Sequence, residues 1–449
     1  MSKQIKLRKG LDIRMKGKAD EILIPAEDPE RYAVKPTDFP GLVPKMCVKP
    51  GAEVKAGTTL FYDKKDENIK YTAPASGVVL DVVRGERRRI LEVVIKSKGD
   101  DYEDFGKADP EKTGVEDIKR KLLDSGLWPA VRQRPYQVVA SPEDSPKSIF
   151  ISGFDTAPLS ADLDYIIELL PRENYLTGIK VLQKLTEGKV YLNLGHRSSS
   201  TVLKSTPGVE INYFKGPHPA GNVGVQIHHI DPLNKGEVVW HVNLQDIIAI
   251  GRLFNEGIYA PDKIVALAGS EVEKPRYYRT RAGACISKLV KDNIISDNIR
   301  YISGNVLTGH KIQADGFLGY YNSTITVIPE GDHYEFFGWI RPGLDKFSLS
   351  RTFLTWLMPG KRYRLNTNMH GGERAFVVTG EYEKVLPMDI YPMQLLKSIL
   401  VDDIDRMEQL GIYEVAEEDF ALCEFVCPSK IEIQSIIRKG LDQMVKEMS

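Results

Sequence analysis

Between residues 147 and 258, short apolar runs alternate with stretches of helical periodicity. The runs at 148–152 (SIFIS), 190–194 (VYLNL) and 238–242 (VVWHV) have the length and composition of buried strands. The stretches after the first and third runs carry apolar residues three and four positions apart, as amphipathic helices do. Strands that alternate with helices predict a mainly parallel sheet covered by helices. This region is therefore expected to form an α/β domain.

The flanking regions follow other patterns, so the 449 residues are expected to form a multi-domain α/β protein. Residues 1–100 contain short strand-like runs broken by Gly and Pro, which predicts a small all-β domain. Residues 386–449 carry two apolar stripes at helical spacing, which predicts a C-terminal helical bundle. Three further segments are expected between these domains: a linker and helix at 101–146, a β-rich domain at 259–340, and a β or irregular connection at 341–385.

The helix expected after the linker carries its own start and stop signals. Thr113 and Glu116 have the spacing of a capping box. Ile118 and Leu122 fall on one face, and Gly126 is a typical C-terminal residue. The sequence therefore predicts a short helix that ends at Gly126.

Composition and charge exclude several classes of protein. The net charge is -1, from 61 basic and 62 acidic residues, which gives no reason to expect nucleic acid as a partner. No stretch approaches the ~18 apolar residues that span a bilayer, and no apolar core of a signal peptide follows the basic N-terminus. The four cysteines are too few for a disulfide scaffold, so a reducing cytoplasm is expected.

Motifs for cofactors and metals are missing or incomplete. The Rossmann-like layout has no G-x-G-x-x-G and no Walker A loop, so the sheet alone gives no reason to expect a bound dinucleotide. The histidines that cluster in one segment lack the spacing of a zinc site, so structural or surface roles are favoured for His196, His218, His228, His229 and His241. No catalytic residue and no metal ligand is predicted.

Cys423 and Cys427 stand in the sequence CEFVCP, which has the spacing found at the end of cubane cluster motifs. A four-iron cluster needs four thiolates, and only two are close together here. On a helix the two cysteines lie one turn apart on one face. A buried helical pair is the favoured interpretation, while a cluster shared with a partner chain and a redox-active dithiol remain as alternatives.

Two loops are candidates for function. Residues 216–222 (GPHPAGN) form a rigid loop that suits a docking surface, the wall of a site, or a plain crossover. Residues 125–136 (SGLWPAVRQRPY) combine aromatic, arginine and proline residues. Such a loop can hold a flat ring that carries carbonyl groups. It can equally be a protein–protein hot spot, or a domain-joining loop anchored by Trp128.

Several segments resemble known families. VKPGAEVKAG (48–57) with YTAPASGVV (71–79) resembles the barrel-sandwich hybrid fold of biotinyl and lipoyl carriers. The carrier lysine would stand near Lys64 or Lys65, but the flanking acids do not match a modification site, so no covalent cofactor is expected. The chain as a whole resembles the A-subunit family of the Na+-translocating NADH:quinone oxidoreductase (NqrA family). That resemblance runs from end to end through RKGLD (8–12), DSGLWPAVRQRP (124–135), LTEGKVY (185–191), GPHPAGN (216–222), ISGNVLTG (302–309) and ALCEFVCPSK (421–430).

The layout is also similar to the C subunit of the Rnf complex and to the NADH-binding flavoprotein subunit of complex I. In those relatives the loop after S-G-L is glycine-rich and embraces FMN, whereas here 128–135 is bulky and charged. The relatives' cluster cysteines are reduced to Cys423 and Cys427. The resemblance therefore implies a scaffold without flavin or iron–sulfur cluster. It also implies a β-grasp domain of the SLBB type, because residues 265–290 resemble that of the relatives.

The resemblance implies a function for the whole chain. It would be a peripheral, non-redox subunit on the cytoplasmic face of the bacterial inner membrane, without a transmembrane segment, docked chiefly to the membrane B subunit. Partner subunits would carry FMN, riboflavin, FAD and a 2Fe-2S cluster, and quinone (ubiquinone) would be the substrate of this translocase. No activity is expected from the isolated chain.

The quinone site is expected at the arginine-aromatic loop. Trp128 and Tyr136 would stack on the ring, and Arg132 or Arg134 would face its oxygens. Two alternatives are a purely structural docking subunit and a stand-alone flavin or NADH oxidoreductase.

Overall fold

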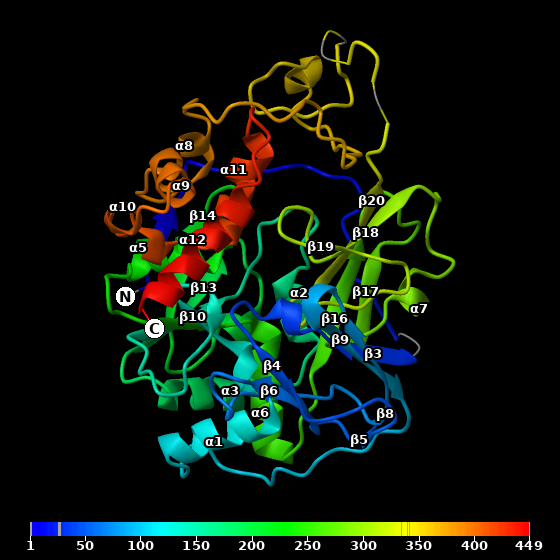
Figure 1. Cartoon of the computed structure of the whole chain (residues 1–449), viewed down its shortest axis with the longest axis vertical. Coiled ribbons are helices and arrows are strands. Elements are labelled where there is room, and N and C mark those ends of the chain that lie inside the picture. Colours follow the sequence, from blue (N-terminus) through cyan, green and yellow to red (C-terminus); the bar gives the residue numbers. More distant parts are fainter. Residues whose placement is uncertain (1, 26–27, 334, 339, 341, 449) are drawn as a thin grey trace.

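The computed structural model describes residues 2–25, 28–333, 335–338, 340 and 342–448. It places an α/β unit, an N-terminal β unit and a second β unit in contact with one another, with helices from the C-terminal region on one side (Figure 1). These elements confirm the mixed α/β, multi-domain fold class predicted from the sequence.

The central sheet is seven-stranded and mainly parallel, as predicted. Neighbouring strands from β1 to β15 run parallel, while β10 and β11 are antiparallel. The SIFIS run forms β12 over the residues predicted from the sequence. From one edge to the other the strands are β1 (Gln4–Lys6), β14 (Glu210–Lys215), β13 (Lys189–Gly195), β12 (Ser148–Ser152), β15 (Val239–Val242), β10 (Val131–Arg134) and β11 (Val138–Val139).

The two faces of this sheet face two different cores, because successive side chains on a strand point in opposite directions. Ile149 and Ile151 belong to a core with α3 (Arg172–Lys184) and α6 (Leu244–Glu256). Phe150 belongs to the other core, which the C-terminal helices complete. The sheet is thus buried on both faces.

The C-terminal region is helical, as predicted. The stripe Ile433, Ile437, Leu441 and Met444 is completely buried along α12. The helices of this region are α8 (Tyr382–Val385), α9 (Pro392–Leu400), α10 (Ile404–Gln409), α11 (Ala421–Val426) and α12 (Ile433–Met448), with 3-10 turns η5 (Ile412–Glu414) and η6 (Glu417–Phe420). Short helices of the α/β unit are α2 (Leu163–Glu168), α4 (Thr201–Lys204) and α5 (Val223–Ile230).

The N-terminal β unit consists of a four-stranded and a three-stranded sheet. Phe61, Tyr71 and Val93 are buried in their shared core. Lys64 and Lys65 are exposed in the turn between β6 and β7. The strands are β3 (Arg31–Val34), β9 (Ile90–Ser97), β8 (Gly77–Arg84) and β5 (Glu53–Val54), then β4 (Pro44–Met46), β6 (Thr59–Asp63) and β7 (Lys70–Thr72), with 3-10 turns η1 (Pro36–Asp38) and η2 (Glu86–Arg88).

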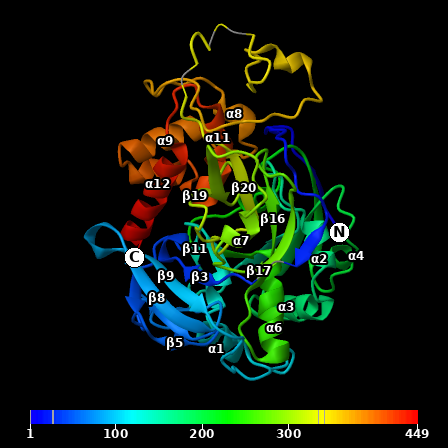
Figure 2. The ribbon, with the colours of Figure 1, turned by 90° about the vertical axis from the view of Figure 1, so that its right-hand side faces the viewer.

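A six-stranded sheet forms the second β unit, which lies beside the N-terminal β unit (Figure 2). Val265, Leu267, Ile325 and Val327 alternate inward into its core. Its order is β19 (His310–Ile312), β18 (Ile299–Ser303), β20 (Thr324–Pro329), β16 (Asp262–Ala268), β17 (Arg276–Arg281) and β2 (Leu23–Pro25), with helix α7 (Ser287–Val290).

The N-terminal 25 residues cross between units, which the sequence did not indicate. β1 pairs in parallel with β14 of the central sheet. β2 pairs in parallel with β17 of the second β unit. Both strands are three residues long, which is too short for a hydrophobic period in the sequence to predict them.

Helix α1 (Val115–Ser125) corrects one detail of the sequence analysis. The capping box of Thr113 and Glu116 is wrong. The N-cap is Gly114, without a side-chain cap, and the Thr113 hydroxyl instead donates to the carbonyl of Asp109. The stop signal is confirmed, because Gly126 closes the helix in the left-handed conformation at φ 76°.

The connection at 341–385 is irregular in its described residues apart from the 3-10 turn η4 (Leu354–Leu357) and α8. One anchor ties it to the second β unit. Arg364 donates from Nε and Nη2 to the two carboxylate oxygens of Glu271, at 2.8 and 2.9 Å. The Glu271 side chain is completely buried.

Removing the Glu271 carboxylate is expected to loosen this anchor in a pH-dependent way. Burial raises the pKa of Glu271, but hydrogen bonds from Arg364, Ser296 and Ser270 outweigh it and lower the pKa to about 2. Because this pKa lies below that of the unfolded chain, the stabilisation is complete above pH ~4.5 and is lost as the pH falls towards 2. Glu271→Gln should therefore cost about 2 kcal/mol at neutral pH and progressively less in acid.

Thermal unfolding of wild type and Glu271→Gln at pH 7, 4 and 3 measures this difference. Glu273→Gln is the matched control, because Glu273 is exposed nearby. A difference between wild type and Glu271→Gln that stays constant with pH would contradict the ionised anchor.

Candidate functional site

A cleft opens at the carboxyl edge of the central sheet, between β12 and β15. The chain leaves β12 towards β13 on one side, while β15 pairs on the other side. The connections therefore diverge at this point, which is where open α/β sheets bind ligands. A cavity of about 230 Å³ lies here.

Four parts of the chain form the walls of this cavity. The ends of β12 and β15 contribute Ser152 and Asn243, and the GPHPAGN loop contributes His218. The second β unit contributes Tyr321, and the C-terminal region contributes Glu418. Helices α5 and α6 both begin at the cleft, so their N-terminal dipoles favour partial negative charge there.

A larger open cavity of about 700 Å³ adjoins the cleft and shares Phe154, Asp155 and Leu163 with it. The side chain of Asp155 is exposed to the space of the cavity. The protein around it nevertheless raises the pKa of its carboxyl group by burial. The walls of the larger cavity also carry basic side chains, namely Arg14, Lys18, His196, Arg197 and Arg362.

The two histidines of the cleft are buried and neutral at pH 7. Burial lowers the pKa of His218 to about 4. Burial, with Arg132 and Arg134 nearby, lowers the pKa of His241 well below its usual value. His218 Nδ1 lies 3.1 Å from the hydroxyl of Thr156, and its Nε2 has no hydrogen-bond partner. The GPHPAGN loop is therefore both a crossover into α5 and a wall of the cleft.

Arg132 is the residue of the arginine-aromatic loop that borders the cleft. Its guanidinium lies 4.2 Å from the ring centroid of Tyr321, a cation–π contact. Nη2 donates to Asn243 Oδ1 at 2.9 Å, and Nε has no hydrogen-bond partner. The side chain is held in place by two contacts and retains an unused donor.

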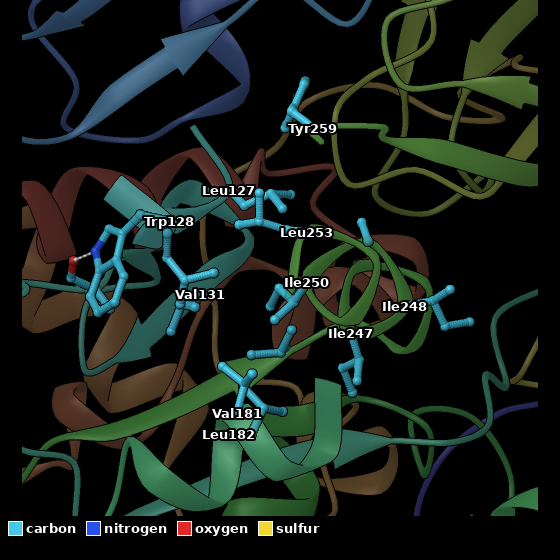
Figure 3. Close-up of a cluster of buried hydrophobic side chains, with 14 of the residues drawn as sticks. Leu127, Trp128, Val131, Val181, Leu182, Ile247, Ile248, Ile250, Leu253 and Tyr259 are labelled. Atoms are coloured by element: carbon cyan, nitrogen blue, oxygen red, sulfur yellow. Dashed lines mark hydrogen bonds between the residues drawn. The ribbon is translucent and has the colours of Figure 1, made fainter. Parts of the chain in front are cut away.

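Trp128 lies in the core of the protein (Figure 3). It is completely buried, and its ring centroid is 5.4 Å from that of Trp240 in an edge-on arrangement. Its indole Nε1 donates to the carbonyl of Ala140 at 2.7 Å. These contacts fix the start of β10.

Arg134 and Tyr136 contact the C-terminal region. Arg134 is completely buried and donates to Glu418 Oε1 at 2.7 Å and to Asp419 Oδ2 at 3.1 Å. Tyr136 is half-buried and packs edge-on against Tyr413 at 6.1 Å between ring centroids. Of the four residues predicted for quinone, the structure thus places Arg132 on the cleft, Trp128 in the core, and the other two against C-terminal helices.

The cysteines do not converge. Cys47 and Cys285 lie in different β units, whereas Cys423 and Cys427 share the core of the C-terminal helices. The Tyr382 hydroxyl donates to Cys427 Sγ at 2.9 Å, and burial raises the pKa of the Cys423 thiol. The predicted burial of the pair among helices is confirmed, but Cys427 follows α11 as its C-cap residue and does not continue the helix. Within the described part of the chain, no group of three or more His, Cys, Asp or Glu side chains could hold a metal ion.

Thiol labelling should separate these environments. In the folded protein only Cys47 is expected to react rapidly with a maleimide, because it is exposed and the other cysteines are buried. All four should react after unfolding in denaturant. Mass spectrometry of the labelled peptides measures this, and rapid labelling of Cys423 or Cys427 in the folded chain would show that the C-terminal core is open.

Three family models match the chain. They are described as the NqrA N-terminal barrel-sandwich hybrid domain (residues 5–98), the NqrA second alpha/beta domain (113–259) and the NQRA C-terminal domain of the SLBB type (264–314). The order of these three domains along the chain agrees with that of the N-terminal β unit, the central α/β unit and the second β unit. The protein is therefore of the class that joins a barrel-sandwich hybrid, an α/β and an SLBB domain in one chain.

Curated relatives extend this match to the whole chain. The A subunit of the Na(+)-translocating NADH-quinone reductase from Hahella chejuensis is 42% identical over 447 residues, which are 99% of this chain and 100% of the relative. Its counterpart from Yersinia pestis bv. Antiqua is 42% identical over 448 residues, with the same coverage. The chain belongs to the family of A subunits of the Na(+)-translocating NADH-quinone reductase.

A solved NAD+-reducing [NiFe]-hydrogenase in the air-oxidised state is a distant neighbour. It has a TM-score of 0.39 and 11% identity, and the match covers 75% of this chain and 64% of the hydrogenase chain. A likeness this weak carries no weight for fold or function. None of the helices in the described residues has the length and apolar character needed to cross a membrane.

Proposed function

We propose that the chain is the peripheral A subunit of the Na+-translocating NADH-quinone reductase and that it shapes the quinone site. In this proposal it docks to the membrane B subunit on the cytoplasmic face and has no activity when isolated. Family membership supports the proposal that the chain is part of a multi-subunit enzyme, because the curated relatives are named as one subunit of that enzyme. FMN, riboflavin, FAD and the 2Fe-2S cluster would belong to partner subunits.

The observation that carries the quinone proposal is the position of Arg132. A quinone is a flat ring with two carbonyl acceptors, and it needs aromatic walls with a few fixed donors. Phe150, Phe154 and Tyr321 line the cleft, and Arg132 stands over Tyr321 with Nε unused. The N-termini of α5 and α6 favour the negative charge that carbonyl oxygens gain on reduction.

In this arrangement Arg132 holds a quinone oxygen, while the other predicted residues act at a distance. Trp128 holds β10 in the core, and Arg134 and Tyr136 fix β10 against the C-terminal helices. His218 adds a neutral side chain to the wall of the cleft. These residues keep the cleft in shape.

The environment of the loop supports the proposed lack of a flavin. Trp128 and Arg134 place large side chains in completely buried positions within the segment that is glycine-rich in flavin-binding relatives. The four cysteines do not come together as the four thiolates that a cubane cluster needs. An absorbance spectrum of the purified chain with flavin bands, or NADH oxidation without partners, would contradict this part of the proposal.

Replacing Arg132 by glutamine is expected to weaken binding of a short-chain ubiquinone analogue by about 10- to 100-fold. The estimate corresponds to the loss of one charge-assisted hydrogen bond, about 1.5–3 kcal/mol. Isothermal titration of the analogue into the purified full chain measures the change. Arg120→Gln, at an exposed position on α1, is the matched control.

A purely structural docking subunit is the second candidate. It is favoured by the fact that the polar groups of Trp128 and Arg134 form their hydrogen bonds and ion pairs within the chain itself. Absence of saturable binding to the full chain, or equal binding by wild type and Arg132→Gln, would favour docking over a quinone site in this cleft.

A further inference from the structure

Large apolar side chains are concentrated on the described residues of the segment 336–378 (336–338, 340 and 342–378), called here the projecting segment. More than half of the exposed large apolar residues in the described chain lie on it. Phe336 is 77% exposed, Ile340 66%, Leu357 59% and Trp356 51%. A concentration of exposed apolar side chains of this kind indicates an interaction site.

The projecting segment lies at one end of the molecule. Both views place it beyond β20 and α8, away from the N-terminal β unit and α1 (Figures 1 and 2). Its base is fixed by the ion pair of Arg364 with buried Glu271. The apolar side chains beyond this anchor are therefore presented outward on a tethered support.

Positive charge accompanies the apolar side chains. Between residues 342 and 364 the acid is Asp345 and the bases are Lys346, Arg351, Lys361, Arg362 and Arg364. Lys346, Lys361 and Arg364 form ion pairs with Glu335, Asp345 and Glu271, so the charge offered to a partner comes from Arg351 and Arg362. Arg351 is exposed and lies over the ring of Trp356, 5.8 Å from its centroid.

The stretch around Met15, between β1 and β2, adds to this charge. Met15 forms a bridge with Tyr363, which places the exposed side chains of Arg14 and Lys16 beside Arg362. The molecule as a whole is nearly neutral, with a net charge of -1, so the local excess of cations is a property of this end.

We infer that the projecting segment, with Arg14 and Lys16, docks on an anionic lipid surface. Tryptophan, phenylalanine and leucine enter the boundary between headgroups and acyl chains, while arginine and lysine contact anionic headgroups. Charge complementarity selects this partner, because an uncharged surface would leave the exposed cations without a counter-charge. The inference does not depend on the quinone proposal.

Flotation of the purified full chain with lipid vesicles tests the inference. The chain is expected to bind vesicles of phosphatidylglycerol and phosphatidylcholine at least about tenfold more strongly than vesicles of phosphatidylcholine alone. Added salt should weaken this binding, because it screens exposed charges.

Two pairs of substitutions separate the apolar and the electrostatic contributions. Trp356→Ser with Leu357→Ser should weaken binding to anionic vesicles by about tenfold or more, through lost apolar burial. Arg351→Gln with Arg362→Gln should weaken it by about 30-fold, at about fivefold for each cation. These positions are exposed, so the folded chain should unfold at the same temperature.

Matched controls lie outside the projecting segment, in the N-terminal β unit and on α1. Leu80→Ser with Val115→Ser removes two exposed apolar side chains, and Lys64→Gln with Lys65→Gln removes two exposed cations. Both controls should bind vesicles as the wild type does. Wild-type binding by the Trp356 and Arg351 pairs would overturn the inference. The inference would also be overturned if the chain did not bind anionic vesicles and bound only membranes that carry the partner subunits. The projecting segment would then contact protein and not lipid.

Discussion

Replacing Arg134 by methionine is expected to destabilise the packing of the C-terminal helices by about 3–5 kcal/mol. The guanidinium is completely buried and pairs with Asp419, which is also completely buried, and with Glu418. Methionine has a similar volume but leaves Asp419 as a buried charge without its partner. Native-state hydrogen exchange of α11 and α12 measures the change, because it reports the opening of one region of a multi-domain chain.

Two further variants show whether the buried pair is the cause. Arg134→Met combined with Asp419→Leu removes both buried charges and should recover part of the loss. Lys439→Met removes an exposed pair between α12 and Asp402, which follows α9, and should cost less than about 1 kcal/mol. Unchanged protection of α11 and α12 in Arg134→Met would contradict the role given to this pair.

Replacing Trp128 by alanine is expected to cost about 3–5 kcal/mol. The indole fills the core against Trp240 and donates to the carbonyl of Ala140. Trp128→Phe keeps an aromatic ring, so it should cost less, about 1–3 kcal/mol for the unsatisfied carbonyl and the lost volume. Urea denaturation followed by circular dichroism measures both variants.

Trp356→Ala is the control for this comparison, because Trp356 is half exposed on the projecting segment and should leave the denaturation midpoint unchanged. A Trp128→Ala variant as stable as the wild type would show that the loop is not part of the core. The same outcome would also weaken the proposal that large buried side chains in residues 128–135 leave no room for a flavin.

The regular elements of the α/β unit could be predicted because their patterns are local. The run 148–152 forms β12, and Gly126 ends α1, since a strand composition and a left-handed cap depend on nearby residues. The capping box at Thr113 failed because a competing local bond, from its hydroxyl to Asp109, was equally available. Strands β1 and β2 could not be predicted, since three residues carry no period and their partners lie far along the chain.

The candidate site was only partly visible for the same reason. The arginine-aromatic loop was singled out by composition, but its residues have different environments. Arg132 borders the cleft, whereas Arg134 is buried by a partner 285 positions away. Arginine is rarely buried unless it is paired, and a partner so far along the chain could not be recognised from the sequence. The cleft itself combines the ends of β12 and β15 with Tyr321 and Glu418, which only the tertiary fold brings together.

The most direct test of the quinone proposal is photolabelling of the assembled reductase with a photoreactive short-chain quinone. Digestion and mass spectrometry would then identify the labelled peptides of this chain. The proposal predicts label on the peptides that contain Arg132 or Tyr321, and loss of that label when unlabelled quinone competes or in Arg132→Gln. Competable label elsewhere on this chain, or only on partner subunits, would contradict a quinone site in this cleft.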